Sequence, residues 1–207
     1  KDFFVLKRDS EEAIRDALLE LVGRRLAESY GVHPLREVQV ICPLREKTSL
    51  SCKALNTEFQ QRLNTQPPGE GSRFRVGDKV IQNKNEYDKE IINGDIGYVL
   101  EIDARARTLT VAFENPERIV ELPLFDNELD LAYAVTCHKY QGSEAPIIVI
   151  PIHRAFGPFL MQRNWLYTAV SRAQRVCILV GQREEIPKII SRNQQQRRFT
   201  RLKAMLR

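Results

Sequence analysis

Hydrophobic positions in the first 69 residues alternate between the spacing of a strand and that of a helix. Two short apolar runs predict strands over residues 3–6 and 38–42, and the first of them is expected to be buried. Apolar residues recur at three- and four-residue steps over residues 14–26 and 54–63, which predicts two helices with one apolar face each. This alternation indicates the first part of an α/β domain.

The pattern changes between about Gly71 and Asp130, where short β-rich runs follow one another without a helical pattern between them. These runs are residues 79–82, 96–100, 109–113 and 118–122. Turn signals separate them, at Gly77-Asp78, Asn93-Gly94-Asp95 and Asn115-Pro116. Strands so close together predict a small antiparallel barrel that is inserted into the larger domain.

The α/β pattern returns in the last third of the chain. Residues 131–137 predict one strand, and residues 146–152 are almost wholly apolar, as is typical of a strand buried on both faces of a parallel sheet. A helix over residues 164–173, a strand over residues 176–180 and a charged helical tail complete the pattern. The predicted fold class is therefore α/β, a parallel sheet flanked by helices with a small inserted antiparallel β-barrel.

The composition is that of a globular protein, with 43% hydrophobic and 29% charged residues in a chain of 207. This length suits one domain, or one domain with a small insertion. No apolar run approaches the roughly 20 residues that span a bilayer, so no membrane partner is expected. The opening Lys1-Asp2-Phe3-Phe4-Val5-Leu6 has no initiating methionine and is too short and mixed for a signal peptide, so we expect a piece of a longer protein.

Charge and cysteine content change this picture little. The net charge is +5, but eight basic and two acidic residues lie after Gly181, which leaves 24 basic and 25 acidic residues in the rest. Charge alone therefore does not establish a nucleic-acid partner, because solvated basic tails are common. The four cysteines form no C-x-x-C pair, which favours free thiols, no metal site and a reducing, cytoplasmic setting.

Two segments carry candidate chemistry. The first is Thr136-Cys137-His138-Lys139-Tyr140-Gln141-Gly142-Ser143-Glu144, directly after a predicted strand, and the second is Trp165-Leu166-Tyr167-Thr168-Ala169-Val170-Ser171-Arg172-Ala173, directly before one. Loops at the carboxyl ends of strands are where ligands bind in an open parallel sheet. The first segment occupies such a loop and combines polar donors with a glycine that permits close backbone approach.

These two segments resemble motifs V and VI of superfamily 1 helicases, specifically the RecD-like group that includes the alpha subunit of exodeoxyribonuclease V. Residues 74–82, 85–88 and 93–97 resemble the beginning of that family's inserted SH3-like barrel. Residues 39–43, with Leu55-Asn56 and Leu63-Asn64, resemble the beginning of its second RecA-like domain, and residues 197–202 are similar to its closing helix. The resemblance thus spans nearly the whole chain.

The resemblance implies a domain division and a missing partner. Residues 1–69 and 127–207 would form the second RecA-like motor domain (2A), and residues 70–126 the SH3-like barrel (2B). Such helicases hold ATP between two RecA-like domains, of which the first supplies the P-loop and the acid that binds Mg²⁺. No G-x-x-x-x-G-K-[ST] occurs in this chain, so we expect ATP and Mg²⁺ to be used by the full-length parent and neither to be bound by the fragment alone.

Residue roles on the nucleotide side follow from the same resemblance. Arg172 matches the motif VI arginine that would reach the γ-phosphate as an arginine finger, which makes it the candidate catalytic residue. Gln141, Gly142 and Glu144 match positions near the nucleotide. Taken without the motif, Arg172 would read as a surface arginine that ends a helix, and Glu144 as a solvated loop carboxylate.

Single-stranded DNA is the implied second ligand. Thr136, His138 and Lys139 match the side of motif V that faces DNA in relatives, where they would bind phosphates without reading bases. Further candidate DNA contacts are Arg45 and, in the barrel, Asn83, Asn85 and Tyr87. Two of these DNA assignments have a plain alternative: His138 could be a structural histidine, and the barrel residues could form a solvated loop. Gln141, matched above to the nucleotide side, could instead touch DNA or couple the two ligands. The loop that holds Arg45 also departs from the family, which tends to carry a glycine there.

The expected function is that of half a DNA helicase motor in repair or recombination, with 5′-to-3′ polarity taken from the resemblance alone. Its partners would be single-stranded DNA, the N-terminal RecA-like domain of the same parent and other subunits of a recombination nuclease. The alternative is a non-catalytic DNA-binding or scaffolding module of a recombination nuclease or a conjugative relaxase.

Overall fold

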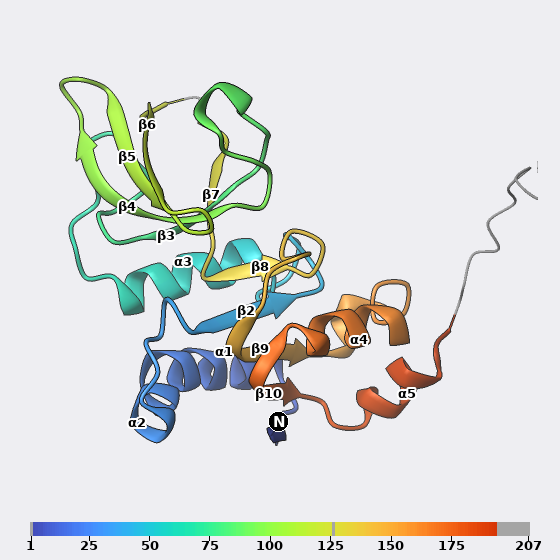
Figure 1. The fold of residues 1–207 in the computed structure, drawn as a ribbon. Helices are drawn as coiled ribbons and strands as arrows, with labels where there is room; N and C mark the ends of the chain where they lie inside the picture. Colours follow the sequence, from blue (N-terminus) through green and yellow to red (C-terminus); the bar gives the residue numbers. More distant parts are fainter. Residues whose placement is uncertain (1, 126, 194–207) are drawn as a thin grey trace, which may run out of the picture.

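One of the two five-stranded sheets is wholly parallel and has the strand order β1-β10-β9-β2-β8 (Figure 1). A computed structural model describes residues 2–125 and 127–193 of the chain. The strands of this sheet are β1 (Asp2–Lys7), β2 (Val38–Cys42), β8 (Ala134–Thr136), β9 (Ala145–Ile152) and β10 (Ala173–Gly181). Parallel neighbours need long crossover connections, and in this sheet helices and the whole second sheet lie in those connections. The predicted parallel α/β sheet is therefore confirmed.

Helices cover both faces of the parallel sheet. They are α1 (Glu11–Glu20), η1 (Leu21–Arg25), α2 (Leu26–Tyr30), α3 (Cys52–Leu63), α4 (Arg163–Ser171) and α5 (Glu185–Ser191), with short 3-10 turns η2 (Tyr87–Lys89) and η3 (Arg154–Phe156). Ser10 caps α1, since its hydroxyl accepts a hydrogen bond from the Ala13 amide at 3.1 Å. Gly31 ends α2 with a positive φ of 65°, a conformation that glycine adopts without strain.

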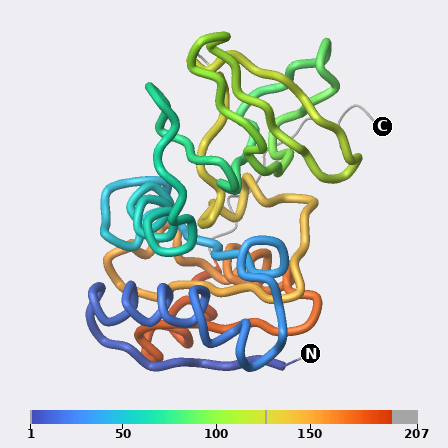
Figure 2. The backbone as a smooth tube through the Cα atoms, turned by 90° about the vertical axis from the view of Figure 1, so that its left-hand side faces the viewer, coloured from blue at the N-terminus to red at the C-terminus, as the bar shows by residue number. Residues whose placement is uncertain are grey.

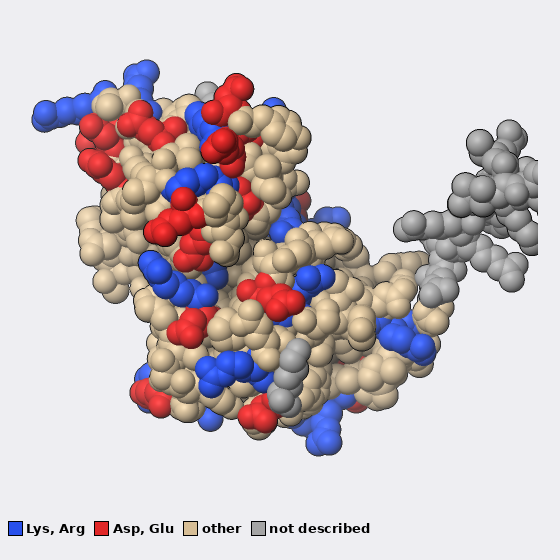
Figure 3. All heavy atoms as spheres, in the orientation of Figure 1, with Lys and Arg blue, Asp and Glu red and all other residues tan. Residues whose placement is uncertain are grey.

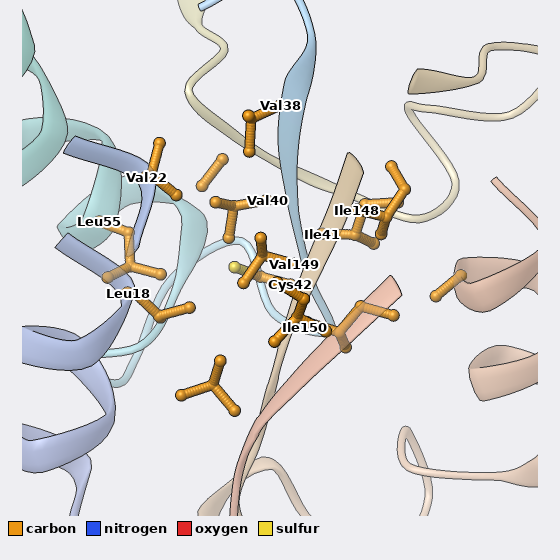
Figure 4. Close-up of a cluster of buried hydrophobic side chains, with 14 of the residues drawn as sticks. Leu18, Val22, Val38, Val40, Ile41, Cys42, Leu55, Ile148, Val149 and Ile150 are labelled. Carbon is orange, nitrogen blue, oxygen red and sulfur yellow. The ribbon is translucent and has the colours of Figure 1, made fainter. Parts of the chain in front are cut away.

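The main core lies where α1 and α3 pack on the parallel sheet. Figure 4 shows Leu18 and Leu55 reaching toward Val40 and Val149, while Ile41 and Ile148 point to the opposite face. All of these side chains are buried, and full burial of each contributes about 1.5–3 kcal/mol. Strand β9 is buried on both faces, as the apolar run over residues 146–152 predicts.

The second sheet is antiparallel, with the order β6-β5-β4-β3-β7. Its strands are β3 (Lys79–Gln82), β4 (Ile96–Asp103), β5 (Thr108–Phe113), β6 (Arg118–Pro123) and β7 (Leu129–Leu131). Alternate residues of β5 are buried, and the sheet encloses its own core around Phe74, Val111 and Phe113. An antiparallel insert is thus present, and β7 belongs to it although this strand follows the predicted boundary at residue 126.

The two sheets lie one above the other, and α3 lies between α1 and the antiparallel sheet in both views (Figures 1 and 2). Asp78 is fully buried at this junction and accepts four hydrogen bonds of 2.5–2.8 Å. The donors are the side-chain amides of Gln60 on α3 and of Asn64 directly after it, the Arg75 backbone amide and the Tyr133 hydroxyl. One carboxylate therefore links α3 and its C-cap to both connections of the antiparallel sheet. Burial raises the pKa of Tyr133, and the Asp78 carboxylate adds to this rise.

The single strand predicted over residues 131–137 is wrong, because the chain passes there from one sheet to the other. Ala132 and Tyr133 separate β7 from β8, and the Gln39 side-chain amide donates to both of their carbonyls at 3.1 Å. Asn56 donates to the carbonyls of Leu131 and Ala134 at 2.8 and 2.9 Å and accepts from the Ala134 amide. These amide side chains satisfy backbone groups that would otherwise need a neighbouring strand, so the crossing stays buried.

The expectation that residues 3–6 form a buried strand is half right. Strand β1 forms, but it is the edge strand of the parallel sheet, and Phe3 and Phe4 remain 53% and 46% exposed. Of the charged helical tail, the structure describes only α5, and residues 197–202 lie outside the described residues. No helix within the described part of the chain is long and apolar enough to cross a bilayer.

Candidate nucleotide and nucleic-acid site

A compact loop, residues 137–144, joins the carboxyl end of β8 to the amino end of β9. The Tyr140 amide donates to the Thr136 carbonyl at 3.1 Å, and the Ser143 amide donates to the Tyr140 carbonyl at 3.2 Å. Tyr140 anchors the loop, since its ring is 4% exposed and its hydroxyl donates to the Glu144 carbonyl at 3.0 Å. The loop therefore turns tightly around one buried ring.

The solvent side of this loop presents the predicted nucleotide residues. Gln141, Gly142 and Glu144 are exposed. Gly142 has a φ of 90°, and nothing lies within 4 Å of the position of a Cβ atom, so only the backbone conformation calls for glycine here. Burial raises the pKa of Tyr140 to about 12; the Glu114 carboxylate adds to this rise and the Arg172 guanidinium opposes it.

Arg172 lies at the end of α4, directly beside the end of this loop. Its carbonyl accepts a hydrogen bond from the Ala145 amide at 3.1 Å, and Ala173 and Ala145 are register partners at the starts of β10 and β9. Arg172 and Glu144 thus precede paired residues on neighbouring strands. Burial raises the pKa of Cys137, and the Arg172 charge opposes this rise.

The Arg172 side chain is half-buried, and its Nε atom has no hydrogen-bond partner among the described residues. A buried, charged donor without an acceptor is unfavourable, by about 1–3 kcal/mol or more. An unpartnered buried polar atom in a folded protein needs an explanation, and a bound ligand is one such explanation. No described residue accepts a hydrogen bond from this Nε atom.

At the other end of the loop, the structure brings three predicted DNA-binding residues together. The Lys139 ammonium contacts the Asn83 side-chain oxygen, which comes from the loop after β3. It also lies 3.2 Å from an Asp130 carboxylate oxygen, and the Arg45 guanidinium donates to that same oxygen at 3.0 Å. Lys139, Asn83 and Arg45 therefore meet although 38 or more residues separate each of them from the next in sequence.

The remaining predicted DNA residues lie apart from that meeting point. Asn85 and Tyr87 form their own group, in which the Asn85 amide donates to the Tyr87 hydroxyl at 2.8 Å and the Tyr87 ring is 76% exposed. His138 is exposed on the loop, which argues against a buried structural histidine. Thr136 is half-buried at the end of β8.

Two residues of this region, Asp130 and Arg73, were not predicted. Asp130 lies on β7 and accepts from Arg45 and Lys139, and an Arg73 nitrogen lies 3.7 Å from its second oxygen. A cleft of about 660 Å³ opens beside them, between α3, β8 and the antiparallel sheet. No local pattern marks Asp130, because its partners lie 9, 57 and 85 positions away. The only sequence signal for this residue was a charged side chain next to the end of a predicted strand.

Neither the surface charge nor the placement of metal-binding side chains indicates a particular ligand. On the face shown in Figure 3, acidic and basic side chains are interspersed over both sheets. This agrees with the near-neutral balance of the chain before Gly181. Residues 2–125 and 127–193 contain no group of three His, Cys, Asp or Glu side chains placed to hold a metal ion.

Comparison with known proteins places these features in a family. The family model for the SH3 domain of ATP-dependent RecD-like DNA helicases matches residues 55–113, and the model for the UvrD-like helicase C-terminal domain matches residues 131–180. The second match contains both the 137–144 loop and Arg172.

Individual relatives agree with these matches. The ATP-dependent RecD2 DNA helicase of Deinococcus radiodurans is 42% identical over 146 residues, which are 66% of this chain and 19% of that protein. The RecBCD enzyme subunit RecD of Mycobacterium tuberculosis is 29% identical over 127 residues, 61% of this chain and 21% of that protein. The chain therefore spans about a fifth of the length of these curated relatives.

Among solved structures, the Pif1 helicase from Bacteroides in complex with ADP-AlF3 and ssDNA aligns with a TM-score of 0.51 and 21% identity. The alignment covers 82% of this chain and 45% of that one, and it shows a shared fold. Two helicase domain models in chain order, relatives that carry the RecD name and this fold lead to one conclusion: the chain belongs to the RecD-like group of superfamily 1 helicases.

Proposed function

We propose that this chain is the second motor domain, with its inserted SH3-like barrel, of an ATP-dependent DNA helicase that moves 5′ to 3′ along single-stranded DNA. Residues 1–69 and 127–207 would be domain 2A and residues 70–126 domain 2B. The observation that carries the proposal is the position of Arg172. Its buried Nε finds no acceptor among residues 2–125 and 127–193, and it lies beside the exposed loop that ends in Glu144.

On the nucleotide side, Arg172 acts as the catalytic arginine finger. Closure of the cleft against the N-terminal RecA-like domain of the parent brings its guanidinium to the γ-phosphate of ATP. Negative charge accumulates on the phosphoryl oxygens in the transition state, and a fixed, planar cation offsets it. Gln141, Gly142 and Glu144 line the same side, where the Glu144 carboxylate accepts a hydrogen bond from the ribose.

On the DNA side, Arg45, Thr136, His138 and Lys139 hold phosphates of the strand, and Asn83, Asn85 and Tyr87 extend the track onto the barrel. Phosphate contacts fix position without reading sequence, as a translocating motor requires. An exposed tyrosine such as Tyr87 can stack on a base of any sequence. Repeated closing and opening of the ATP cleft then moves the strand in steps.

The rest of the machinery belongs to the parent protein. The N-terminal domain supplies the P-loop and the acidic residue for Mg²⁺, as the resemblance to RecD-like helicases implies. When bound there, Mg²⁺ would supply positive charge that offsets the charge of the phosphates. The relative from Mycobacterium tuberculosis is named as a RecBCD subunit, which supports a place in DNA repair or recombination and further subunits as partners.

The test compares the full-length parent with this 207-residue chain alone. We expect the parent to hydrolyse ATP faster when single-stranded DNA is added, and to unwind a duplex with a 5′ tail but not one with a 3′ tail. The isolated chain is expected to fold, to bind single-stranded DNA weakly and to hydrolyse no ATP. ATP turnover by the isolated chain would overturn the assignment of half a site, and a parent without DNA-stimulated turnover would favour the scaffolding alternative.

A further inference from the structure

Three cationic side chains from three different elements converge on one carboxylate. Arg45 comes from the loop after β2, Arg73 from the segment before β3, and Lys139 from the 137–144 loop, and their nitrogens lie 3.0, 3.7 and 3.2 Å from Asp130 oxygens. We call Arg45, Arg73, Lys139 and Asp130 the Asp130 cluster. One carboxylate cannot neutralise three cations, so the cluster keeps a net positive charge.

The members of the Asp130 cluster differ in how firmly they are held. The Arg45 and Arg73 side chains are 66% and 62% exposed, whereas those of Lys139 and Asp130 are 26% and 27% exposed. Exposed ion pairs contribute little stability, so another anion can replace Asp130 as a partner of the two arginines. A phosphate suits arginine as an acceptor, because the planar donors can reach two of its oxygens at once.

The cleft beside the cluster has the size and lining for a segment of nucleic-acid backbone. Its volume of about 660 Å³ lies in the range of ligand sites. Charged lining residues are four cations against two carboxylates: Arg45, Lys53, Arg73 and Lys139 against Glu46 and Asp130. Ile81, Leu131 and Val135 contribute apolar surface, on which a sugar or base can pack without sequence preference.

We propose that this cleft binds the sugar–phosphate backbone of single-stranded DNA, with Arg73 as a further phosphate contact and Asp130 as an internal counter-ion that a DNA phosphate replaces. The inference rests on the proposed function and adds to it. Arg73 and β7, which carries Asp130, lie at the two connections of the antiparallel sheet. The bound DNA strand therefore passes the junction between the two sheets. Because Asp130 returns to the cations when the strand leaves, the cleft releases DNA more readily than a purely cationic one.

The test measures binding of a fluorescein-labelled oligodeoxythymidine to the full-length parent over a series of salt concentrations. Arg73→Gln is expected to weaken binding several-fold and to reduce the slope of log K against log salt by about 0.7, the value for one phosphate contact on a single strand. Asp130→Asn is expected to tighten binding several-fold and to steepen the slope, because the cations lose their internal competitor. Arg73→Lys should keep the wild-type slope, since it keeps the charge.

The matched control is Arg105→Gln, which removes the same charge from the exposed β4–β5 turn of the antiparallel sheet and should leave binding unchanged. Thermal unfolding of each variant checks that the fold is intact. If Arg73→Gln behaves like Arg105→Gln, the strand does not use this cleft. Weaker binding by Asp130→Asn would make Asp130 a support for the cations and overturn its role as a competitor. In both cases wild type still binds DNA, whereas a wild-type protein that binds no single-stranded DNA would contradict the proposed function itself.

Discussion

The cations at the two ends of the 137–144 loop differ in whether the described residues offer them an acceptor. At the Glu144 end, Arg172 has a buried Nε for which the described residues offer no acceptor. At the Lys139 end, Asp130 already provides a carboxylate to three cations. The first arrangement has no acceptor among the described residues. The second already has a carboxylate but keeps a net positive charge. A short loop can therefore serve a nucleotide at one end and a sliding strand at the other.

The largest effect is expected at the Arg172 end. Arg172→Ala in the parent should lower DNA-stimulated ATP turnover by at least about 100-fold, because arginine fingers contribute on the order of 10³ to 10⁵ in rate. Arg172→Lys should recover little of this, since an ammonium lacks the planar fork. Arg175→Ala is the matched control, as Arg175 is exposed three residues further along β10. Wild-type turnover in Arg172→Ala would make it an ordinary structural arginine.

The junction behind the loop should respond to pH. Lys79 on β3 is buried and donates to the Gln39 side-chain oxygen at 2.9 Å, and burial lowers the pKa of its ammonium to about 8. The folded state therefore holds the proton more weakly than the unfolded state, whose lysine pKa is about 10.4. Burial of the charge lowers stability fully below pH 8, and this penalty disappears as the pH rises toward 10.4.

We accordingly expect the Lys79 contribution to raise the free energy of unfolding by about 2 kcal/mol between pH 7.5 and 9.5. Lys79→Met should lose this rise, and urea unfolding of both proteins at each pH measures it. The difference between the two proteins isolates Lys79 from other titrating groups. A difference that stays constant over this range would mean that Lys79 keeps an ordinary pKa in the folded protein.

At the Lys139 end the expected effect is smaller. Lys139→Ala should weaken binding of single-stranded DNA several-fold and reduce the salt slope by about 0.7, because one phosphate contact is lost. Equilibrium binding at several salt concentrations measures both quantities. Lys7→Ala removes an exposed cation from the end of the edge strand β1 and serves as the control. Equal effects of the two substitutions would show that charge acts here without a defined contact.

The smallest effect concerns the anchor of the loop itself. Tyr140→Phe removes the hydroxyl that donates to the Glu144 carbonyl, which should lower the free energy of unfolding by about 1 kcal/mol. For a chain of this size that corresponds to a fall of about 2–4 °C in Tm. Tyr167→Phe, on the exposed side of α4, should leave Tm unchanged. If the two variants unfold at the same temperature, the hydroxyl does not support the loop.

Local patterns predict the elements of this fold well, and contacts between distant residues explain what they miss. The strands over residues 38–42 and 79–82 have the predicted bounds, because apolar runs and turn residues lie within each segment. Exposure of β1 depends on the order of strands in the sheet, which no short segment contains. The break after Leu131 depends on side chains of Gln39 and Asn56, 75 or more positions away.

The candidate site divides in the same way. Family resemblance, rather than periodicity, pointed to the 137–144 loop and to Arg172, and the structure brings both to the starts of β9 and β10. Asp130 was not predicted, because a single acidic residue before the predicted strand over residues 131–137 indicates no site by itself. The structure shows Arg45 and Arg73 beside it.

The central claim is that the Arg172 end of the loop serves the nucleotide and the Lys139 end serves DNA. Its most direct test measures two quantities on the same two variants of the parent. These quantities are ATP turnover at saturating DNA and the Kd for single-stranded DNA, for Arg172→Ala and Lys139→Ala. We predict that Arg172→Ala loses turnover and keeps its Kd, and that Lys139→Ala has a weaker Kd and regains turnover at saturating DNA. Loss of both properties to the same degree in both variants would contradict the account, because the loop would then act as one undivided site.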